Sequence, residues 1–268
     1  MQDLIGLPGT SIQSISVYLL LLMLSSLRVG AFLVASPFFG SRMVPLTVRI
    51  VFSIAIGLGI MSKVEFPNLN ILMGTSLLPI VFQEIFVGLA CGMVLNICFA
   101  SVILAGEKIA ATSGLAFAAQ IDPTSGAQSP VISQIFQLFL LILFFSLNGH
   151  LVIFDLIFKS FDLVPLGSFY EFENIVEKSL KSSNSIYSNA VIIVLPIVSI
   201  LFFMNLGIGF ITKSAPQLNL FSFGFPLTIL GTFFALYFSV DALQFVFSEL
   251  INEAIGYVKD ILEVSPDG

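Results

Sequence analysis

The sequence contains few of the residues from which most catalytic and metal sites are built. Its 268 residues include one histidine, His150, and two cysteines, Cys91 and Cys98. The cysteines lie seven positions apart in one hydrophobic segment, so they are too far apart to form a disulfide with each other. A Cys/His metal site would lack ligands, and we expect neither a metal nor a cofactor. No nucleophile elbow, Walker loop, HExxH motif or dinucleotide fingerprint is present, which predicts a protein that is not an enzyme.

Charged residues are also scarce, at 10% of the chain, whereas soluble domains contain about 25%. The net charge of −6 provides no basic surface for nucleic acid, so we expect no nucleic-acid partner. Hydrophobic residues make up 57% of the sequence, and the mean hydropathy is +1.06. This composition predicts an integral membrane protein in contact with lipid.

Six hydrophobic blocks follow one another along the chain, and they predict an all-α membrane protein with broken helices. The blocks are near 12–36, 46–62, 69–105, 131–158, 186–211 and 218–250. The third block contains Pro79, so it is either a broken helix or two helices that meet at this proline. No basic leader precedes the first block, which favours an uncleaved span over a signal peptide. The charged connection 159–185 is interpreted as a surface segment.

A polar, glycine-rich stretch from Gly106 to Pro130 separates the third and fourth blocks. Polar loops of this length are uncommon and are often functional. Asp122, Pro123 and Gly126 have the composition of a turn. Asp122 has no histidine or carboxylate close in sequence, which disfavours a catalytic acid. A loop within a hydrophobic assembly must be buried in protein or line a watery cavity. The apolar residues 115–118 could then form a seal.

Three charged residues, Arg28, Arg49 and Glu84, lie inside apolar blocks. A charge at the depth of a bilayer costs about 2.5–3.5 kcal/mol on insertion scales unless a partner or water compensates it. The residues therefore belong either to an ion or proton pathway or to a structural pair of one arginine with Glu84. Glu107 and Lys108 flank the start of the polar loop.

Small and polar residues recur every four positions in the third block, at Glu84, Gly88, Gly92, Asn96 and Ala100. Residues with this spacing lie along one face of a helix. Gly88 and Gly92 form the small-residue spacing that lets two membrane helices approach closely. This face packs either within the chain or against another subunit.

Several segments in this order resemble the FliR family, a membrane subunit of the flagellar type III export apparatus that is homologous to SctT of injectisomes. They are FFGSRMVPLTVRI (38–50), QEIFVGLACGMVL (83–95), GLAFAAQIDPTSGAQSPVI (114–132), LNGHL (147–151) and KSAPQLNLFSFGFPLTI (213–229). The resemblance covers essentially the whole chain.

The resemblance implies a FliP-like helical region over 1–185, including a plug loop at 106–130, and a FliQ-like hairpin with an acidic tail over 186–268. It implies assembly with FliP-type and FliQ-type subunits and association with an FlhB-type subunit. The assembly would form a pore for unfolded export substrates in the bacterial inner membrane, at the flagellar basal body.

Taken with the observations above, the resemblance leads to a hypothesis for the roles of individual residues. The plug would contain Gly114, Leu115, Ala116, Phe117, Ala118, Asp122, Pro123 and Gly126. Structural or intersubunit charges would be Arg28, Arg49, Glu84, Glu107 and Lys108, and helix packing would involve Gly88, Gly92 and Asn96.

Two other functions are weighed against this one. A secondary transporter for a small solute would need discontinuous helices in both halves of the chain, and the sequence offers one candidate break, at Pro79. An intramembrane hydrolase would need paired catalytic groups on facing helices, and no His/Asp or Asp/Asp pair is evident.

Overall fold

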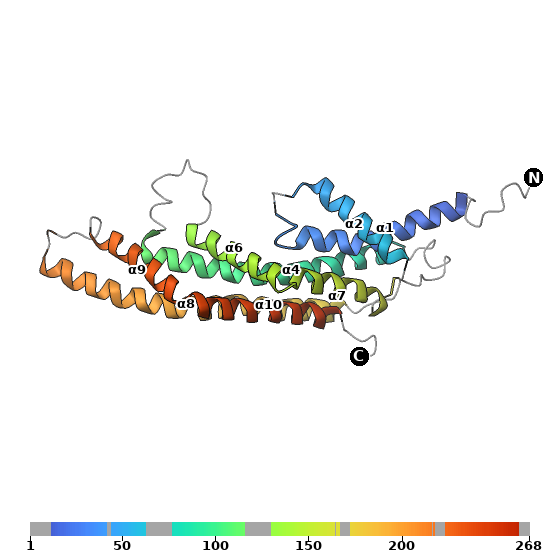
Figure 1. The fold of residues 1–268 in the computed structure, drawn as a ribbon. Coiled ribbons are helices and arrows are strands. Elements are labelled where there is room, and N and C mark those ends of the chain that lie inside the picture. The colour runs from blue at the N-terminus through green and yellow to red at the C-terminus, as the bar shows by residue number, and fades with distance from the viewer. Residues whose placement is uncertain are drawn as a thin grey trace, which may run out of the picture. The chain divides into compact units, whose positions relative to one another are not determined.

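The computed structural model describes residues 12–41, 44–62, 77–115, 130–163, 165–166, 172–215, 217 and 223–262. Helices account for the regular structure of these residues (Figure 1). In chain order they are α1 (Ile12–Ala35), α2 (Leu46–Met61), α4 (Leu77–Ser113), α6 (Val131–Ser146), α7 (Gly149–Leu163), α8 (Phe172–Ser214), α9 (Phe225–Phe238) and α10 (Val240–Leu262).

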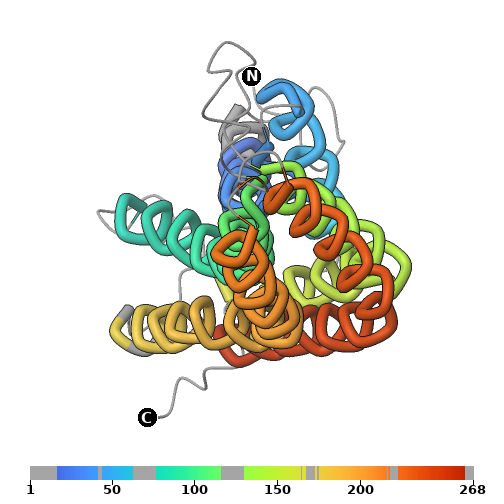
Figure 2. The backbone as a smooth tube through the Cα atoms, turned by 90° about the vertical axis from the view of Figure 1, so that its left-hand side faces the viewer, coloured from blue at the N-terminus to red at the C-terminus, as the bar shows by residue number. Residues whose placement is uncertain are grey.

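Three helices are long and apolar enough to cross a membrane: α1 over Val17–Ala35, α4, and α8 over Ile175–Ser214. Two further pairs pass the same criterion together, but each is sharply bent. The bend is 64° between α6 and α7 and 65° between α9 and α10, and the second turn is visible at the right of Figure 2. The chain therefore has three such helices among its described residues, or up to five spans if each bent pair counts as one.

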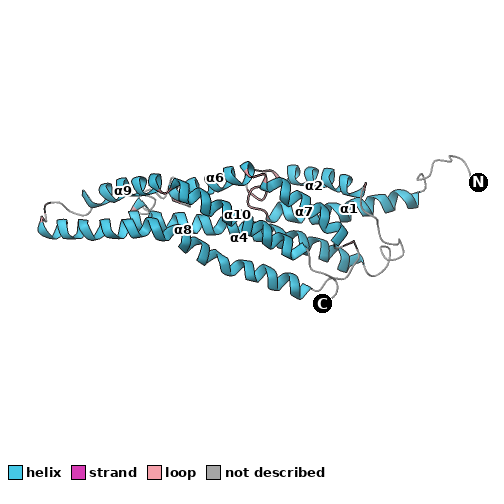
Figure 3. Ribbon diagram, turned by 60° about the horizontal axis from the view of Figure 1, so that its bottom comes forward, coloured by secondary structure: helices cyan, strands magenta, loops and turns pink. Residues whose placement is uncertain are grey.

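These observations confirm the predicted fold class. The described residues contain helices and connecting turns but no β-strand (Figure 3). The fourth and sixth hydrophobic blocks are each divided into two helices, which agrees with the expectation of broken helices. Asn148 has a φ of 56° at the first break, a left-handed conformation that asparagine tolerates better than most residues.

Helix α4 is one unbroken helix of 37 residues that begins at Leu77, so the described residues contain no break after Pro79. That a second helix meets α4 near this proline stays a prediction. Pro79 is its third residue, within the first turn. The backbone N–H groups of the first turn have no partner inside the helix, so a proline there removes no helical hydrogen bond. The preceding part of the third block, 69–76, lies outside the described residues.

The polar loop also begins later than the composition indicates. Residues 106–113 continue α4, and Ile109 and Ala110 are buried on its inner face. Glu107 and Lys108 are exposed helical residues and do not flank the loop. Alanine, glutamate and lysine have high helix propensity, so this small and polar stretch extends the helix as far as Gly114, whose φ is 84°.

The polar connection 159–185 is largely helical. α7 extends to Leu163, and α8 begins at Phe172 and includes its charged second half. Helix α8 is 43 residues long and continues through Pro196. Exposed side chains such as Glu177, Leu180 and Lys181 agree with the expected surface position.

The chain forms two compact units, each assembled from separate segments. One contains Met1–Asn96, Leu151–Leu180 and Ile255–Gly268, and the other contains Ile97–His150 and Lys181–Ala254. In the first unit α1 packs against α2, and buried residues include Leu24, Phe32 and Val87. In the second, Ile109 and Phe247 are among the buried residues. The two units are defined by contacts within the chain, whereas the predicted regions are defined by their resemblance to FliP and FliQ. The division between 1–185 and 186–268 therefore stays a prediction.

Candidate functional site

One face of α4 packs along α1 throughout the first unit. A Cβ atom built on Gly88 would lie 2.2 Å from the carbonyl oxygen of Arg28, and one built on Gly92 would lie 2.6 Å from the Cβ of Ala35. Further along the same face, the amide of Asn96 donates a hydrogen bond to the carbonyl of Ala35 at 3.4 Å. The helix face predicted from the four-residue spacing therefore packs within the chain. The backbones of α4 and α1 are in direct contact there.

The same α4 face holds a buried ion pair with α1. Arg28 is 1% exposed and Glu84 is fully buried. The Nε of Arg28 donates to Oε2 of Glu84 at 2.8 Å, and its second terminal nitrogen donates to Oε1 at 3.0 Å. This two-point geometry matches the planar fork of the guanidinium to both carboxylate oxygens. The structure thus pairs one of the two predicted arginines with Glu84.

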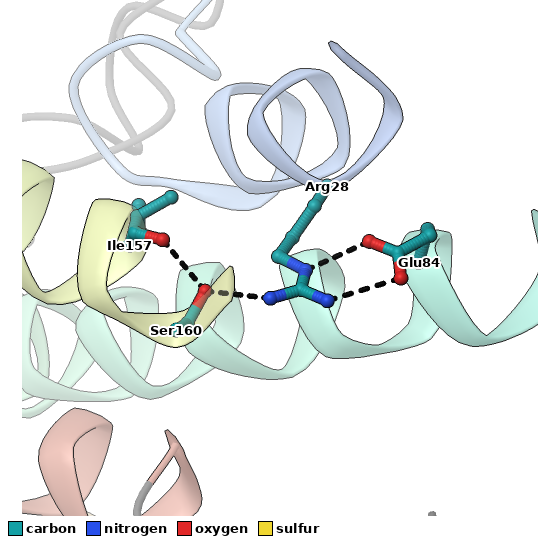
Figure 4. A network of polar contacts seen from close by, with 4 residues as sticks. All are labelled: Arg28, Glu84, Ile157 and Ser160. Atoms are coloured by element: carbon teal, nitrogen blue, oxygen red, sulfur yellow. Dashed lines mark hydrogen bonds and ion pairs between the residues drawn. The ribbon is translucent and has the colours of Figure 1, made fainter. Parts of the chain in front are cut away.

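Helix α7 completes the environment of the guanidinium. Its remaining terminal nitrogen donates to Oγ of Ser160 at 2.7 Å, and that hydroxyl donates to the carbonyl of Ile157 at 2.6 Å (Figure 4). The guanidinium carbon lies 4.0 Å from the centre of the Phe161 ring, a cation–π distance. Every nitrogen of the guanidinium has a hydrogen-bond partner. The arrangement therefore links α1, α4 and α7 structurally, and it does not form a pathway for protons.

Arg49 makes a different kind of contact. Its terminal nitrogen donates to the carbonyls of Ser41 at 2.5 Å and Val44 at 2.9 Å. Its Nε is buried and has no hydrogen-bond partner within the described part of the chain. Arg49 therefore holds the turn that precedes α2, and Glu84 is not its partner.

The structure describes only the start of the predicted plug. Gly114 is buried and Leu115 is half-buried, directly after α4. Ala116, Phe117, Ala118, Asp122, Pro123 and Gly126 lie outside the described residues. At the far end of this segment Pro130 precedes α6. The backbone of α6 is close to α4 there, since a Cβ on Gly106 would lie 2.5 Å from the Cα of Ser133.

An apolar groove lies between α4 and α8 in the second unit. Its volume is about 760 Å³. The residues that line it include Leu104, Lys108 and Thr112 of α4 and Tyr187, Val194 and Phe203 of α8. Lys108 is its charged lining residue, whereas the neighbouring Glu107 is exposed outside the groove.

Sequence reasoning did not single out Ser160 or Phe161. A signal for Ser160 exists, because it follows Ile153 and Ile157 at helical spacing, and all three are buried. A polar residue on an apolar helix face indicates a buried hydrogen bond. No group of histidine, cysteine, aspartate and glutamate side chains that could hold a metal occurs among the residues that the structure describes.

The chain matches known proteins over most of its length. The model of the family described as bacterial export proteins, family 1, matches residues 19–254. The flagellar biosynthetic protein FliR of Escherichia coli K12 is 32% identical over 76% of this chain and 77% of its own length. FliR of Bacillus subtilis is 30% identical over 88% of this chain and 92% of its own length.

A relative with a different name matches over a similar extent. The surface presentation of antigens protein SpaR of Shigella sonnei is 27% identical over 87% of this chain and 90% of its own length. The family match covers far more than half of the sequence and includes both compact units. The chain therefore belongs to family 1 of the bacterial export proteins, in agreement with the resemblance to the FliR family that its motifs carry.

Proposed function

We propose that this chain is a membrane subunit of a flagellar type III export apparatus. In this proposal it forms, together with FliP-type and FliQ-type subunits, the pore through which unfolded flagellar proteins cross the bacterial inner membrane. It would also associate with an FlhB-type subunit. The family is one of export proteins and not of enzymes, so the prediction that the chain is not an enzyme is confirmed.

The observation that carries the proposal is the match to relatives named as flagellar biosynthetic proteins. The chain covers between 77% and 92% of the two FliR sequences described above. The arrangement of motifs along the whole sequence, and not one local similarity, therefore supports an export role.

Large exposed hydrophobic surfaces support assembly with other membrane subunits. Helix α8 exposes Leu195 at 60%, Phe203 at 70% and Phe210 at 71%, and α9 exposes Phe238 at 79%. Apolar surfaces of this extent require a lipid or a protein partner. The groove between α4 and α8 adds a concave apolar surface that a partner helix can enter, with Lys108 available to a carboxylate on that helix.

The proposed hairpin is supported by the way α8 pairs with α10. The amide of Asn189 donates to the carboxylate of Glu253 at 3.4 Å. The ammonium of Lys178 donates to the carbonyl of Asp260 at 2.5 Å. Of these two contacts, the one with the lower residue number on α8 has the higher residue number on α10. The two helices are therefore antiparallel. The Asn189–Glu253 contact lies within 186–268 and is expected if this region is a FliQ-like hairpin, whereas Lys178 precedes the region on the same continuous helix.

The segment from Gly114 to Gly126 is proposed as the plug of the pore. Deletion of 114–120 tests this role in the assembled complex. We expect the deletion to let small ions leak through the membrane while the complex still assembles, because the apolar residues at 115–118 would form the seal. Unchanged ion permeability in a complex that assembles normally would disprove the plug assignment.

A secondary transporter remains the alternative for comparison, because the two bent helix pairs are the kind of discontinuity that such proteins use. Purification from the membrane distinguishes the two functions. An export-gate subunit is expected to purify bound to several copies of smaller hydrophobic subunits. A chain that purifies alone and moves a solute in vesicles would instead establish a transporter.

A further inference from the structure

The C-terminal end of α4 is completed by side chains from two other helices of the second unit. The last four carbonyls of an α-helix have no partner within the helix. At this end the amide of Asn205, on α8, donates to the carbonyl of Thr112 at 3.4 Å. The hydroxyl of Thr228, on α9, donates to the carbonyl of Ser113 at 3.0 Å. Two of the unsatisfied carbonyls are therefore capped from outside the helix.

The Thr228 bond of this cap is buried, so water does not replace it, whereas the Asn205 bond is partly buried. Ser113 is fully buried, and Thr228 is 2% exposed. In a protein surrounded by lipid, an unpaired backbone carbonyl costs several kcal/mol. The Thr228 hydroxyl also lies 3.0 Å from the carbonyl of Phe225, within α9, so its single proton is shared between a bond inside α9 and the bond to α4.

Gly114, the residue that follows the last residue of α4, lies against the same part of α9. Gly114 has a φ of 84°, a left-handed conformation typical of the glycine that ends a helix. A Cβ atom built on Gly114 would lie 2.7 Å from Cδ1 of Phe225. The Phe225 ring therefore covers the turn at which the chain leaves α4. The amide of Leu115 then donates to the hydroxyl of Ser113 at 3.4 Å.

We propose that Asn205, Phe225 and Thr228 are positioning residues for the segment that follows α4. They fasten the last turn of α4 to α8 and α9, and so they set the point and direction in which the chain enters the proposed plug. We call these three residues the α4 cap. This inference rests on the proposed function of the plug, but the existence of the cap is measurable without it.

The first test is hydrogen exchange of the backbone amides at 109–115 in the assembled export complex. Thr228→Val removes the hydroxyl but keeps the shape of the side chain. We expect exchange about five-fold faster at these amides, the ratio that corresponds to the net loss of about 1 kcal/mol for one hydrogen bond. Thr228→Ser keeps the donor, and we expect it to restore slow exchange.

The matched control is Thr232→Val. Thr232 is fully buried one turn further along α9, and its hydroxyl donates to the carbonyl of Thr228 at 2.7 Å, within the same helix. We expect this variant to leave exchange at 109–115 unchanged. Equal acceleration by both valine variants would indicate general loosening of α9 and would overturn the cap. Unchanged exchange in Thr228→Val would overturn it as well.

The second test is ion leakage through the same complexes. We expect Thr228→Val to leak while Thr228→Ser and Thr232→Val do not, with normal assembly in all three. Faster exchange without leakage, in a system where the 114–120 deletion does leak, would overturn the positioning role. If the deletion itself does not leak, the plug fails, and faster exchange in Thr228→Val would still support the cap.

Discussion

The backbone of Gly88 on α4 lies against the carbonyl of Arg28 on α1, with room for a hydrogen atom but not for a methyl group. One turn earlier on α4, the Glu84 carboxylate binds the guanidinium of the same Arg28 at 2.8 Å. The close approach and the ion pair therefore depend on each other. The glycine brings the helix axes near enough for the arginine to be fully buried, and the carboxylate compensates the charge that burial would otherwise leave unpaired.

Replacement of Gly88 by alanine should separate α1 from α4. The new Cβ would lie 2.2 Å from the Arg28 oxygen and 2.9 Å from the Cβ of Ala31. The first contact is with backbone, which cannot rotate away, so we expect a destabilisation near the upper end of the usual range for overpacking, about 3 kcal/mol. Thermal unfolding of the purified complex in detergent measures this change.

Gly59→Ala is the control for that experiment. Beyond its own helix backbone and its chain neighbours, no atom lies within 4 Å of a Cβ built on Gly59, which is also helical. Alanine in a helix interior is more stable than glycine by about 0.5–1 kcal/mol, so we expect an unchanged or slightly higher melting temperature. If both substitutions lowered stability equally, close packing at Gly88 would not be the cause.

Removing one member of the buried ion pair should cost more than removing both. Arg28→Met leaves the Glu84 carboxylate buried without its partner, and such changes cost about 3–5 kcal/mol. In the double variant Arg28→Met/Glu84→Met no charge remains, so we expect higher stability than in the single Arg28→Met variant. Denaturation of the native chain, Arg28→Met, Glu84→Met and the double variant forms a double-mutant cycle that measures the coupling.

The exposed pair of Lys159 and Asp155 provides a comparison on α7. Its atoms are 2.7 Å apart, but the side chains are 64% and 58% exposed. Exposed pairs of this kind contribute little, because water and salt screen the two charges and both side chains lose freedom in pairing. Lys159→Met should therefore change stability far less than Arg28→Met, and a similar loss in both would contradict the role assigned to burial.

Gly114→Ala should loosen the end of α4 for two separate reasons. The left-handed backbone costs an alanine about 1–2 kcal/mol, and its Cβ would also contact the Phe225 ring at 2.7 Å. In the double variant Gly114→Ala/Phe225→Ala, the ring contact disappears but the backbone strain remains. We expect the Gly114→Ala change to be less destabilising in a Phe225→Ala background than in the native chain, as measured by thermal unfolding. Equal effects in the two backgrounds would show that the ring contact contributes nothing.

Reversing the charge of Lys108 should disrupt assembly if a partner helix occupies the groove. A carboxylate on that helix would then face Lys108→Glu, and a like-charge contact at an interface costs several kcal/mol. We expect recovery of the smaller hydrophobic subunits with this chain to fall below about a tenth, since 1.4 kcal/mol already corresponds to ten-fold. Glu107→Lys, on the adjacent exposed position outside the groove, should leave recovery unchanged. Equal recovery with both variants would show that the groove is not an interface.

Much of the fold follows from local patterns that the sequence contains. Apolar blocks of spanning length predict membrane helices, and the observed helices lie within or across those blocks. The four-residue spacing of Glu84, Gly88, Gly92 and Asn96 places them on one helix face, because helical periodicity depends only on positions along the chain. The turn at Asn148 is likewise a local property of the residues that form it.

The misinterpreted boundaries have local causes as well. A proline breaks a helix only in its interior, and Pro79 lies in the first turn of α4. Residues 106–113 are small and polar, but alanine, glutamate and lysine are also good helix formers, so composition alone assigned them to a loop. The decisive signal was Gly114, whose left-handed backbone ends α4.

The sequence by itself determined that this is an all-α membrane protein of an export family, with buried charges and one close-packing face. Only the tertiary structure decided that Glu84 pairs with Arg28 and not with Arg49, that Ser160 and Phe161 complete the pair, and that Thr228 and Asn205 cap α4. The hydrogen-bonded partners among these are separated by between 56 and 132 residues. A residue's own face on a helix is set by local periodicity, but its partner depends on which helices pack together, and that choice is made by the burial of whole surfaces.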